Sequence, residues 1–230
     1  MNYKLNVNPN LSQKPLTVVF CLPGNNFSND FLCSWSELLL WCVHNNIRPV
    51  INVQYDAVVY YVRNKCLGGD VRRGKLQKPF NGQVPYDFLM WIDSDIIFTP
   101  EHFKKLLQRK LPIVSGIYLM QGATHYATVV DWDEKYFEKN GTFQFAQLKD
   151  FNNLVNPVEV DYTGFGFFLA KYGVFESLEY PWFKPIFYNI GNLYDFCSED
   201  VGVCKLLKAA GHKIFIDPTV KVGHQKKVII

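Results

Sequence analysis

The feature that most constrains this chain is an alternation, in its first half, of short apolar runs with segments of helical periodicity. Residues 15–26, "PLTVVFCLPGNN", form an apolar run that stops at Pro-Gly-Asn-Asn, which is typical of a strand buried on both faces. Apolar residues recur at helical spacing in 28–46, where Ser28 or Asn29 can act as the N-cap. A second strand-like run follows in 48–55, and a second helix is expected in 56–69, from Asp56 to the glycine pair. This order requires parallel strands and right-handed crossovers, so it predicts a Rossmann-like α/β unit.

A third strand is expected in 86–93, and the helix expected behind it, in 99–110, begins with Thr99 as cap and Pro100 at the first helical position. A fourth strand is expected in 111–120. Three short strand-like pieces, a glycine-bearing segment and a terminal helix and strand complete the pattern, in the ranges 125–132, 141–148, 156–162, 163–178 and 198–224. There is no internal repeat or Pro/Ser-rich linker, so we expect both halves to share one continuous sheet.

Size and composition favour one ordinary globular domain over residues 1–230. The net charge is +3 with scattered Lys and Arg, which gives no reason to expect a nucleic-acid partner. No apolar run is long enough for a membrane span and no signal-peptide pattern is present, so we expect a cytoplasmic protein. The six cysteines include no C-x-x-C pair, which favours buried free thiols over zinc ligands or disulfides.

Two acidic residues follow the third predicted strand in the stretch "LMWIDSDIIFTP", residues 89–100. Ligands of open α/β sheets bind at the carboxyl ends of strands, where Asp93 and Asp95 are expected to lie. Strand alternation predicts that the two side chains share a face, and two nearby carboxylates are costly unless a cation lies between or beside them. Oxygen ligands favour Mg²⁺ or Mn²⁺. The alternative is that the Asp-Ser-Asp segment only caps a helix or forms a turn.

With these segments in view, the chain resembles a GT-A-fold glycosyltransferase that uses a nucleotide-sugar donor. "MWIDSDIIFTPEHF" is similar to the D-x-D segment of that superfamily, "CLPGNN" to the nucleotide-contacting strand and "VRNKCL" to an Arg-Asn element. "TGFGFFLAKYGVFE" and the segment 198–224 resemble the acceptor-side and closing segments, and the likeness covers roughly 15–225. The resemblance implies a mixed, mostly parallel central sheet flanked by helices, with a nucleotide-binding half in about 15–115 and an acceptor-binding half in about 116–230.

The resemblance also implies roles for individual residues. Asp95 would be the main ligand of Mn²⁺ or Mg²⁺, Asp93 would contact the metal, directly or through water, or the donor ribose, and His224 would add a further ligand. Asp200, with Glu199 as its alternative, would be the catalytic base of an inverting transfer of a hexosyl or deoxyhexosyl group. A retaining transfer, which has no base behind the sugar, stays open. The acidic pair has a structural alternative, since acids are also favoured in the first turn of a helix capped by Ser198. The alternative for His224 is an ordinary surface residue.

The remaining candidates concern the donor, for which a UDP-sugar is the first expectation. Residues expected to contact the nucleotide or its sugar are Pro23, Gly24, Asn25, Arg63, Asn64, Asp93, Ser94, Asp95, Gly164 and Gly166. The acceptor would be a glycan or another hydroxyl compound. Two other functions stay open: a sugar-phosphate nucleotidyltransferase, which would want a basic glycine-rich loop after the first strand, and a non-catalytic nucleotide- or glycan-binding domain. "CLPGNNFSND" has one glycine and no Lys or Arg, which counts against the first of these.

Overall fold

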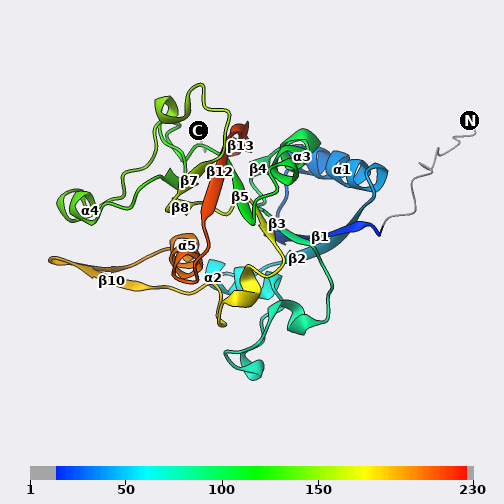
Figure 1. Cartoon of the computed structure of the whole chain (residues 1–230), viewed down its shortest axis with the longest axis horizontal. Coiled ribbons are helices and arrows are strands. Elements are labelled where there is room, and N and C mark those ends of the chain that lie inside the picture. The colour runs from blue at the N-terminus through cyan, green and yellow to red at the C-terminus, as the bar shows by residue number, and fades with distance from the viewer. Residues whose placement is uncertain (1–13, 227–230) are drawn as a thin grey trace, which may run out of the picture.

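The computed structural model of the chain describes residues 14–226 and contains one large sheet that includes strands from both halves of the sequence (Figure 1). Seven strands lie in the order β2-β1-β3-β9-β5-β12-β7. Their bounds are β1 Leu16–Pro23, β2 Ile47–Gln54, β3 Phe88–Ile92, β5 Ile113–Ile117, β7 Val158–Val160, β9 Phe167–Lys171 and β12 Ile214–Lys221. Five run in one direction, whereas β9 and β7 are antiparallel to their neighbours. The predicted mixed, mostly parallel α/β sheet is therefore confirmed.

Helices cover both faces of this sheet (Figure 1). Within the described residues the α-helices are α1 Asn29–His44, α2 Val59–Cys66, α3 Pro100–Gln108, α4 Glu134–Asn140 and α5 Glu199–Ala209. Short 3-10 turns span Val71–Arg73, Pro79–Gly82, Leu148–Phe151 and Phe175–Ser177. No helix within 14–226 is both long enough and apolar enough to cross a bilayer.

The alternation of side chains along β1 shows how the two layers form. Val18 and Phe20 pack in the core that contains α1 and α3, while Val19 and Cys21 pack in the core that contains α2 and α5. Both sets are fully buried, which is why this strand reads as a continuous apolar run. The helix starts at Ser28 and Thr99 are confirmed, since the Ser28 hydroxyl accepts from the Phe31 amide and Thr99 forms a capping box with His102.

Smaller two-stranded pairs lie outside the large sheet. They are β4 Ile96–Ile97 with β13 Gly223–His224, β6 Thr128–Val129 with β8 Tyr162–Thr163, and β10 Phe187–Ile190 with β11 Leu193–Phe196. The pairing of β4 with β13 brings the end of the described chain beside the Asp-Ser-Asp segment.

Two predictions about elements were wrong, and one element was missed. No regular strand forms within 141–148, where the chain runs as a loop into a 3-10 turn. The helix expected from Asp56 begins at Val59, because residues 55–58 form a bend in which the Asp56 carboxylate accepts from the Val58 amide. The hairpin of β10 and β11 was missed, although Gly191 and Asn192 between runs rich in aromatics are a hairpin signal.

Candidate active site

The Asp-Ser-Asp segment forms a tight turn at the carboxyl end of β3. β3 ends at Ile92, and the Ile96 amide donates to the Asp93 carbonyl at 3.0 Å before β4 begins. The strand alternation from which Asp93 and Asp95 were predicted to share a face therefore does not reach them, because the strand ends before Asp93, although both residues line the same hollow. Each of the two carboxylates is neutralised by its own cationic side chains.

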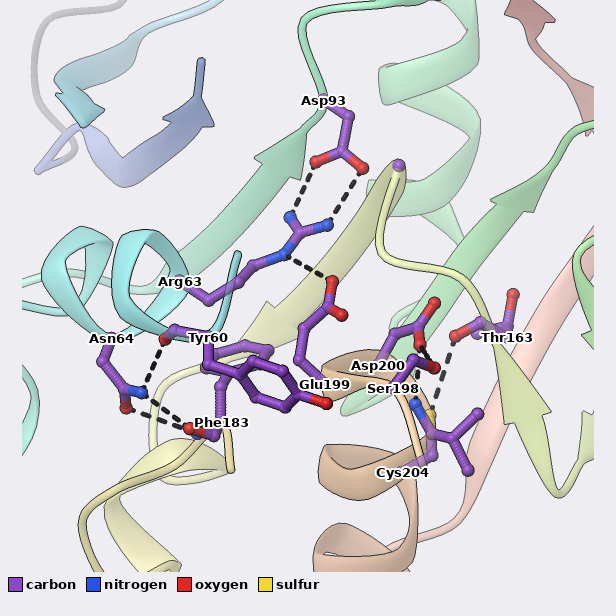
Figure 2. Close-up of polar contacts among 12 residues, drawn as sticks. Tyr60, Arg63, Asn64, Asp93, Thr163, Phe183, Ser198, Glu199, Asp200 and Cys204 are labelled. Carbon is purple, nitrogen blue, oxygen red and sulfur yellow. Dashed lines mark hydrogen bonds and ion pairs between the residues drawn. The ribbon is translucent and has the colours of Figure 1, made fainter. Parts of the chain in front are cut away.

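Asp93 forms a bidentate ion pair with Arg63 of α2 (Figure 2). The guanidinium Nη1 and Nη2 atoms donate to Oδ1 and Oδ2 at 2.7 and 2.9 Å. The Arg63 Nε atom lies 3.6 Å from an oxygen of Glu199 at the start of α5. Three segments that are distant in sequence, α2, the end of β3 and the start of α5, thus meet at one guanidinium.

Arg63 is almost completely buried, with 4% of its surface exposed. Its guanidinium also lies over the rings of Trp91 and Phe165, at 5.4 and 5.7 Å from their centres. Burial lowers the pKa of Arg63, but the adjacent carboxylates of Asp93 and Glu199 outweigh it and raise that pKa above its ordinary value. The group is therefore a permanent positive charge inside the protein.

Asp95 is in a different environment, formed by the end of the described chain. Its Oδ2 atom lies 3.0 Å from His224 Nε2 and 2.9 Å from Lys226 Nζ. Burial raises the pKa of Asp95, but the hydrogen bonds with His224 and Lys226 lower it to about 2. For His224 burial lowers the pKa, whereas the bonds to Asp95 and to the Leu119 carbonyl raise it above its ordinary value. Asp95 is thus held in its ionised form.

The orientation of His224 fits a metal ligand. Its Nδ1 atom lies 2.7 Å from the Leu119 carbonyl, which can only accept, so Nδ1 carries the proton. This leaves Nε2 facing Asp95 Oδ2, and a neutral imidazole would present its lone pair to an anionic oxygen. A second proton or a cation satisfies both atoms, and a backbone carbonyl on the other ring nitrogen is the usual support for a metal-binding histidine.

This region offers few side chains that could bind a metal ion. No cluster of three or more His, Cys, Asp or Glu side chains suited to a metal occurs within residues 14–226. Asp95 and His224 supply two donors, while both oxygens of Asp93 already accept from Arg63. Two protein donors fit Mg²⁺ or Mn²⁺, because these ions commonly complete their shell with water and substrate phosphates.

An open hollow of about 300 Å³ lies at the carboxyl edge of the sheet beside these carboxylates. Its lining includes predicted donor-contacting residues from three segments, namely Pro23, Gly24, Arg63, Asp93, Ser94 and Asp95. Gly24 has φ +147°, and a Cβ there would lie 2.8 Å from the Ser94 Cβ. Only glycine therefore lets the end of β1 pass this close to the Asp-Ser-Asp turn.

Four other predicted residues do not line this hollow. Asn25 is exposed and accepts from the Asn26 amide group, while Asn64 is buried and its amide donates to the carbonyls of Tyr60 and Phe183. The remaining two, Gly164 and Gly166, pack against the ring of Tyr118. A Cβ on Gly166 would lie 2.7 Å from that ring, so the glycine allows close approach of the tyrosine. The Gly166 carbonyl also accepts from the Asp93 amide at 3.0 Å.

Glu199 and Asp200 lie in the first turn of α5 and face different neighbours (Figure 2). Burial and the nearby Asp200 carboxylate raise the pKa of Glu199, although Arg63 acts in the opposite direction. Asp200 accepts from the Tyr162 hydroxyl at 2.8 Å, from the Val201 amide at 2.8 Å and from the Ser198 hydroxyl. The acidic pair therefore lies beside the Asp93–Arg63 pair.

Sequence reasoning missed several contributors to this region. Tyr55, Asp56 and Val59 line the hollow, and nothing in their local sequence distinguishes them from ordinary loop and helix residues. Lys226 contacts Asp95 only because β13 pairs with β4, which no local pattern encodes. Three aromatic residues, Tyr162, Phe165 and Trp182, are buried and belong to the core, so their rings do not offer a face for stacking on a sugar.

Comparison with known proteins adds to this picture at the level of the fold. No protein-family model matches the sequence, and no curated protein matches it significantly. The structure is similar to that of A197 from STIV, with a TM-score of 0.51, 15% sequence identity and coverage of 94% of this chain and 96% of that chain. It is also similar to GalNAc-T7, crystallised with UDP, GalNAc and Mn²⁺, with a TM-score of 0.50 and 11% identity over 94% of this chain. The aligned region is 45% of the GalNAc-T7 chain.

The fold is therefore that of the GT-A-like α/β class, with one mixed sheet of seven strands and helices on both faces. At these identities the similarity concerns the fold, and function has to be argued from the site.

Proposed function

We propose that the protein is a metal-dependent glycosyltransferase that moves a hexosyl or deoxyhexosyl group from a nucleotide-diphosphate donor, with a UDP-sugar favoured, to an acceptor hydroxyl. The observation that carries the proposal is the convergence of Gly24, Arg63 and the Asp-Ser-Asp turn around one hollow, with Glu199 joined to them through Arg63. The GT-A-like fold supports it, since a protein of similar fold, GalNAc-T7, was crystallised with UDP, GalNAc and Mn²⁺.

The nucleotide is proposed to lie in the hollow, whose lining comes only from residues 23–95. This supports the assignment of nucleotide binding to the first half of the chain, about 15–115, and of acceptor binding to the second half. Asp95 and His224 would hold Mn²⁺ or Mg²⁺, which when bound neutralises negative charge on a leaving diphosphate. The contact of Asp93 with the metal or the donor ribose stays a prediction, and in this arrangement its carboxylate orients Arg63.

The acceptor side is proposed to use a carboxylate of the Glu199–Asp200 pair. The acceptor oxygen attacks the anomeric carbon on the face opposite the diphosphate, whose bond to that carbon breaks, so the configuration is inverted. During the attack the acceptor proton passes to the carboxylate. Asp200 is our proposed base, oriented by the Tyr162 hydroxyl and the Val201 amide. Glu199 is the alternative, because a carboxylate with a raised pKa is a stronger base.

Calorimetric titration with UDP, GDP, CMP and dTDP, with and without Mn²⁺, tests the donor side. We expect Mn²⁺-dependent binding of one nucleoside diphosphate, weakened in Asp95→Asn by at least about 10–100-fold, the range known for residues that support metal ligands. The matched control is Glu101→Gln, which removes an exposed carboxylate of α3. Binding that is indifferent to Mn²⁺ and to Asp95 would contradict the proposal.

Release of UDP from UDP-glucose, UDP-galactose, UDP-GlcNAc and UDP-GalNAc measures turnover, and the pair Asp200→Asn and Glu199→Gln locates the base. We expect Asp200→Asn to lower kcat by about 10²–10⁴-fold with UDP binding unchanged, the usual contribution of general-base catalysis. If Glu199→Gln alone has this effect, the roles are exchanged. Full activity in both variants would exclude a carboxylate base at this helix start.

A further inference from the structure

The hairpin of β10 and β11 carries an aromatic surface that no other part of the protein covers within residues 14–226. It extends away from the large sheet beyond α5 (Figure 1). Phe187, Tyr194 and Phe196 are 63, 72 and 52% exposed, which is unusual for three neighbouring aromatic side chains. Isolated exposed apolar residues are ordinary, but a contiguous group commonly marks a binding surface.

The strand register places these rings on one face. Phe187 pairs with Phe196, and Asn189 pairs with Tyr194, so these four side chains project to the same side of the hairpin. The rings of Phe187 and Tyr194 are nearly parallel, at 18° with centres 5.9 Å apart, and the Phe196 ring lies 6.0 Å from that of Phe187. We name Phe187, Asn189, Tyr194 and Phe196 the hairpin platform.

The opposite face of the hairpin is attached to the protein. Tyr188 contacts the ring of Phe137 in α4 at 5.2 Å, and the ammonium group of Lys205 in α5 lies 5.3 Å from the Tyr188 ring centre. At the base of the hairpin the Tyr60 hydroxyl donates to the Cys197 carbonyl at 2.8 Å. The platform therefore faces outward from a supported strand pair whose last residues lead directly into Ser198, Glu199 and Asp200.

The side chains of the hairpin platform favour one class of ligand. It presents three aromatic rings, one amide and one phenolic hydroxyl, and no charged group. Aromatic faces carry negative partial charge and attract the C–H groups of a pyranose ring, while the Asn189 amide and the Tyr194 hydroxyl can bond to sugar hydroxyls. An anionic membrane surface would require Lys or Arg, and the segment "FYNIGNLYDF" contains neither.

From this surface we infer that the hairpin platform binds a neutral oligosaccharide and so holds the acceptor of the transferase. The inference rests on the proposed function and narrows its acceptor from any hydroxyl compound to a glycan of several pyranose units. The continuity of Phe196 with the acidic pair explains how a chain held on the platform would reach the proposed base, Asp200, with its terminal hydroxyl.

Affinity electrophoresis of the full chain through hydroxyethyl cellulose, glycogen, galactomannan and xylan tests the inference. We expect at least one polysaccharide to retard the protein, and the double variant Phe187→Ser/Tyr194→Ser to bind about tenfold more weakly or worse, since two ring contacts are lost. The matched control is Tyr61→Ser/Tyr172→Ser, which removes two equally exposed tyrosines outside the hairpin, 60 and 59% exposed. The control should bind as the unmodified protein does.

The inference would be overturned if none of the four polysaccharides retarded the unmodified protein, or if the platform and control variants were retarded equally. A change from dimer to monomer in light scattering of the platform variant only would also overturn it, in favour of a second copy of the chain. Hairpin-dependent sedimentation with phosphatidylcholine vesicles would also overturn it, in favour of a membrane surface. UDP titration of the same variants separates the two proposals. If the protein binds a polysaccharide through the hairpin but binds no nucleotide, the proposed transferase function is wrong and the platform remains. If it binds a nucleotide but the platform variant is retarded by polysaccharide as strongly as the control, only the platform is wrong.

Discussion

Asp93 accepts two hydrogen bonds from the buried guanidinium of Arg63, whereas Asp95, two residues further along the chain, faces the partly exposed side chains of His224 and Lys226. The first carboxylate is matched by a permanent cation that also faces Glu199. The second is matched by an imidazole and an ammonium group that are both partly exposed to solvent. One short turn thus joins a carboxylate in a buried ion pair to a half-exposed carboxylate, which is our proposed metal ligand.

Removal of the Arg63 guanidinium should lower the free energy of unfolding more than any other change considered. A small loss would contradict the contrast between Asp93 and Asp95. In Arg63→Leu the carboxylates of Asp93 and Glu199 stay close to the core without a counter-charge, so we expect the free energy of unfolding to fall by about 3–5 kcal/mol. Urea denaturation measures it, with Arg72→Leu as the control, because the Arg72 side chain is exposed and pairs with Asp70 on the surface. A loss below about 1 kcal/mol, the value typical of surface pairs, would contradict the structural role of Arg63.

A second arginine–carboxylate pair, outside the hollow, sharpens the comparison through its pH dependence. Arg109 donates to the buried Asp217 at 2.6 Å, and burial raises the pKa of Asp217, but the bonds from Arg109 and Thr219 lower it below its ordinary value. Because the folded pKa is lower than the unfolded value of about 3.9, the pair contributes stability that is complete above that pH. The contribution is lost as pH falls through the lowered folded pKa.

We therefore expect Asp217→Asn to lower the free energy of unfolding at pH 7 by about 1.5–3 kcal/mol, the cost typical of hydrogen bonds to charged groups. The difference between the variant and the unmodified protein should shrink as pH falls below about 4. Urea denaturation at pH 7, 5 and 3 measures this difference. An undiminished difference at pH 3 would mean that packing, and not the charge of Asp217, is responsible.

The smallest effect on the free energy of unfolding is expected for a partner of Asp95. Lys226→Gln removes one of the two cationic partners of Asp95, and since the Lys226 side chain is about 41% exposed, the free energy of unfolding should fall by less than about 1 kcal/mol. Thermal and urea denaturation measure it beside Arg63→Leu. A loss as large as that of Arg63→Leu would show that Asp95 is as much a structural carboxylate as Asp93, and the contrast between them would disappear.

The sequence by itself determined the α/β class, the parallel first half and the position of Asp93 and Asp95 at a strand end. Period-2 and period-3.6 patterns, caps such as Ser28 and Thr99, and buried apolar runs are local properties, so they are visible without a structure. The short elements of the second half were predicted less well, because a two-residue strand such as β6 or β8 has too few residues to show a period. The β10–β11 hairpin had a visible signal in Gly191–Asn192 that was not used.

Only the tertiary structure decided which charges meet. Arg63 and Asp93 are 30 residues apart, and Asp95 and His224 are 129 apart, so their pairing depends on how α2 and β13 pack and not on any spacing in the sequence. Sequence reasoning grouped Asp93 with Asp95 because they are neighbours in the chain. The fold separates their roles because the strand ends at Ile92, and beyond it each carboxylate turns to whichever cation the surrounding elements bring within hydrogen-bonding distance.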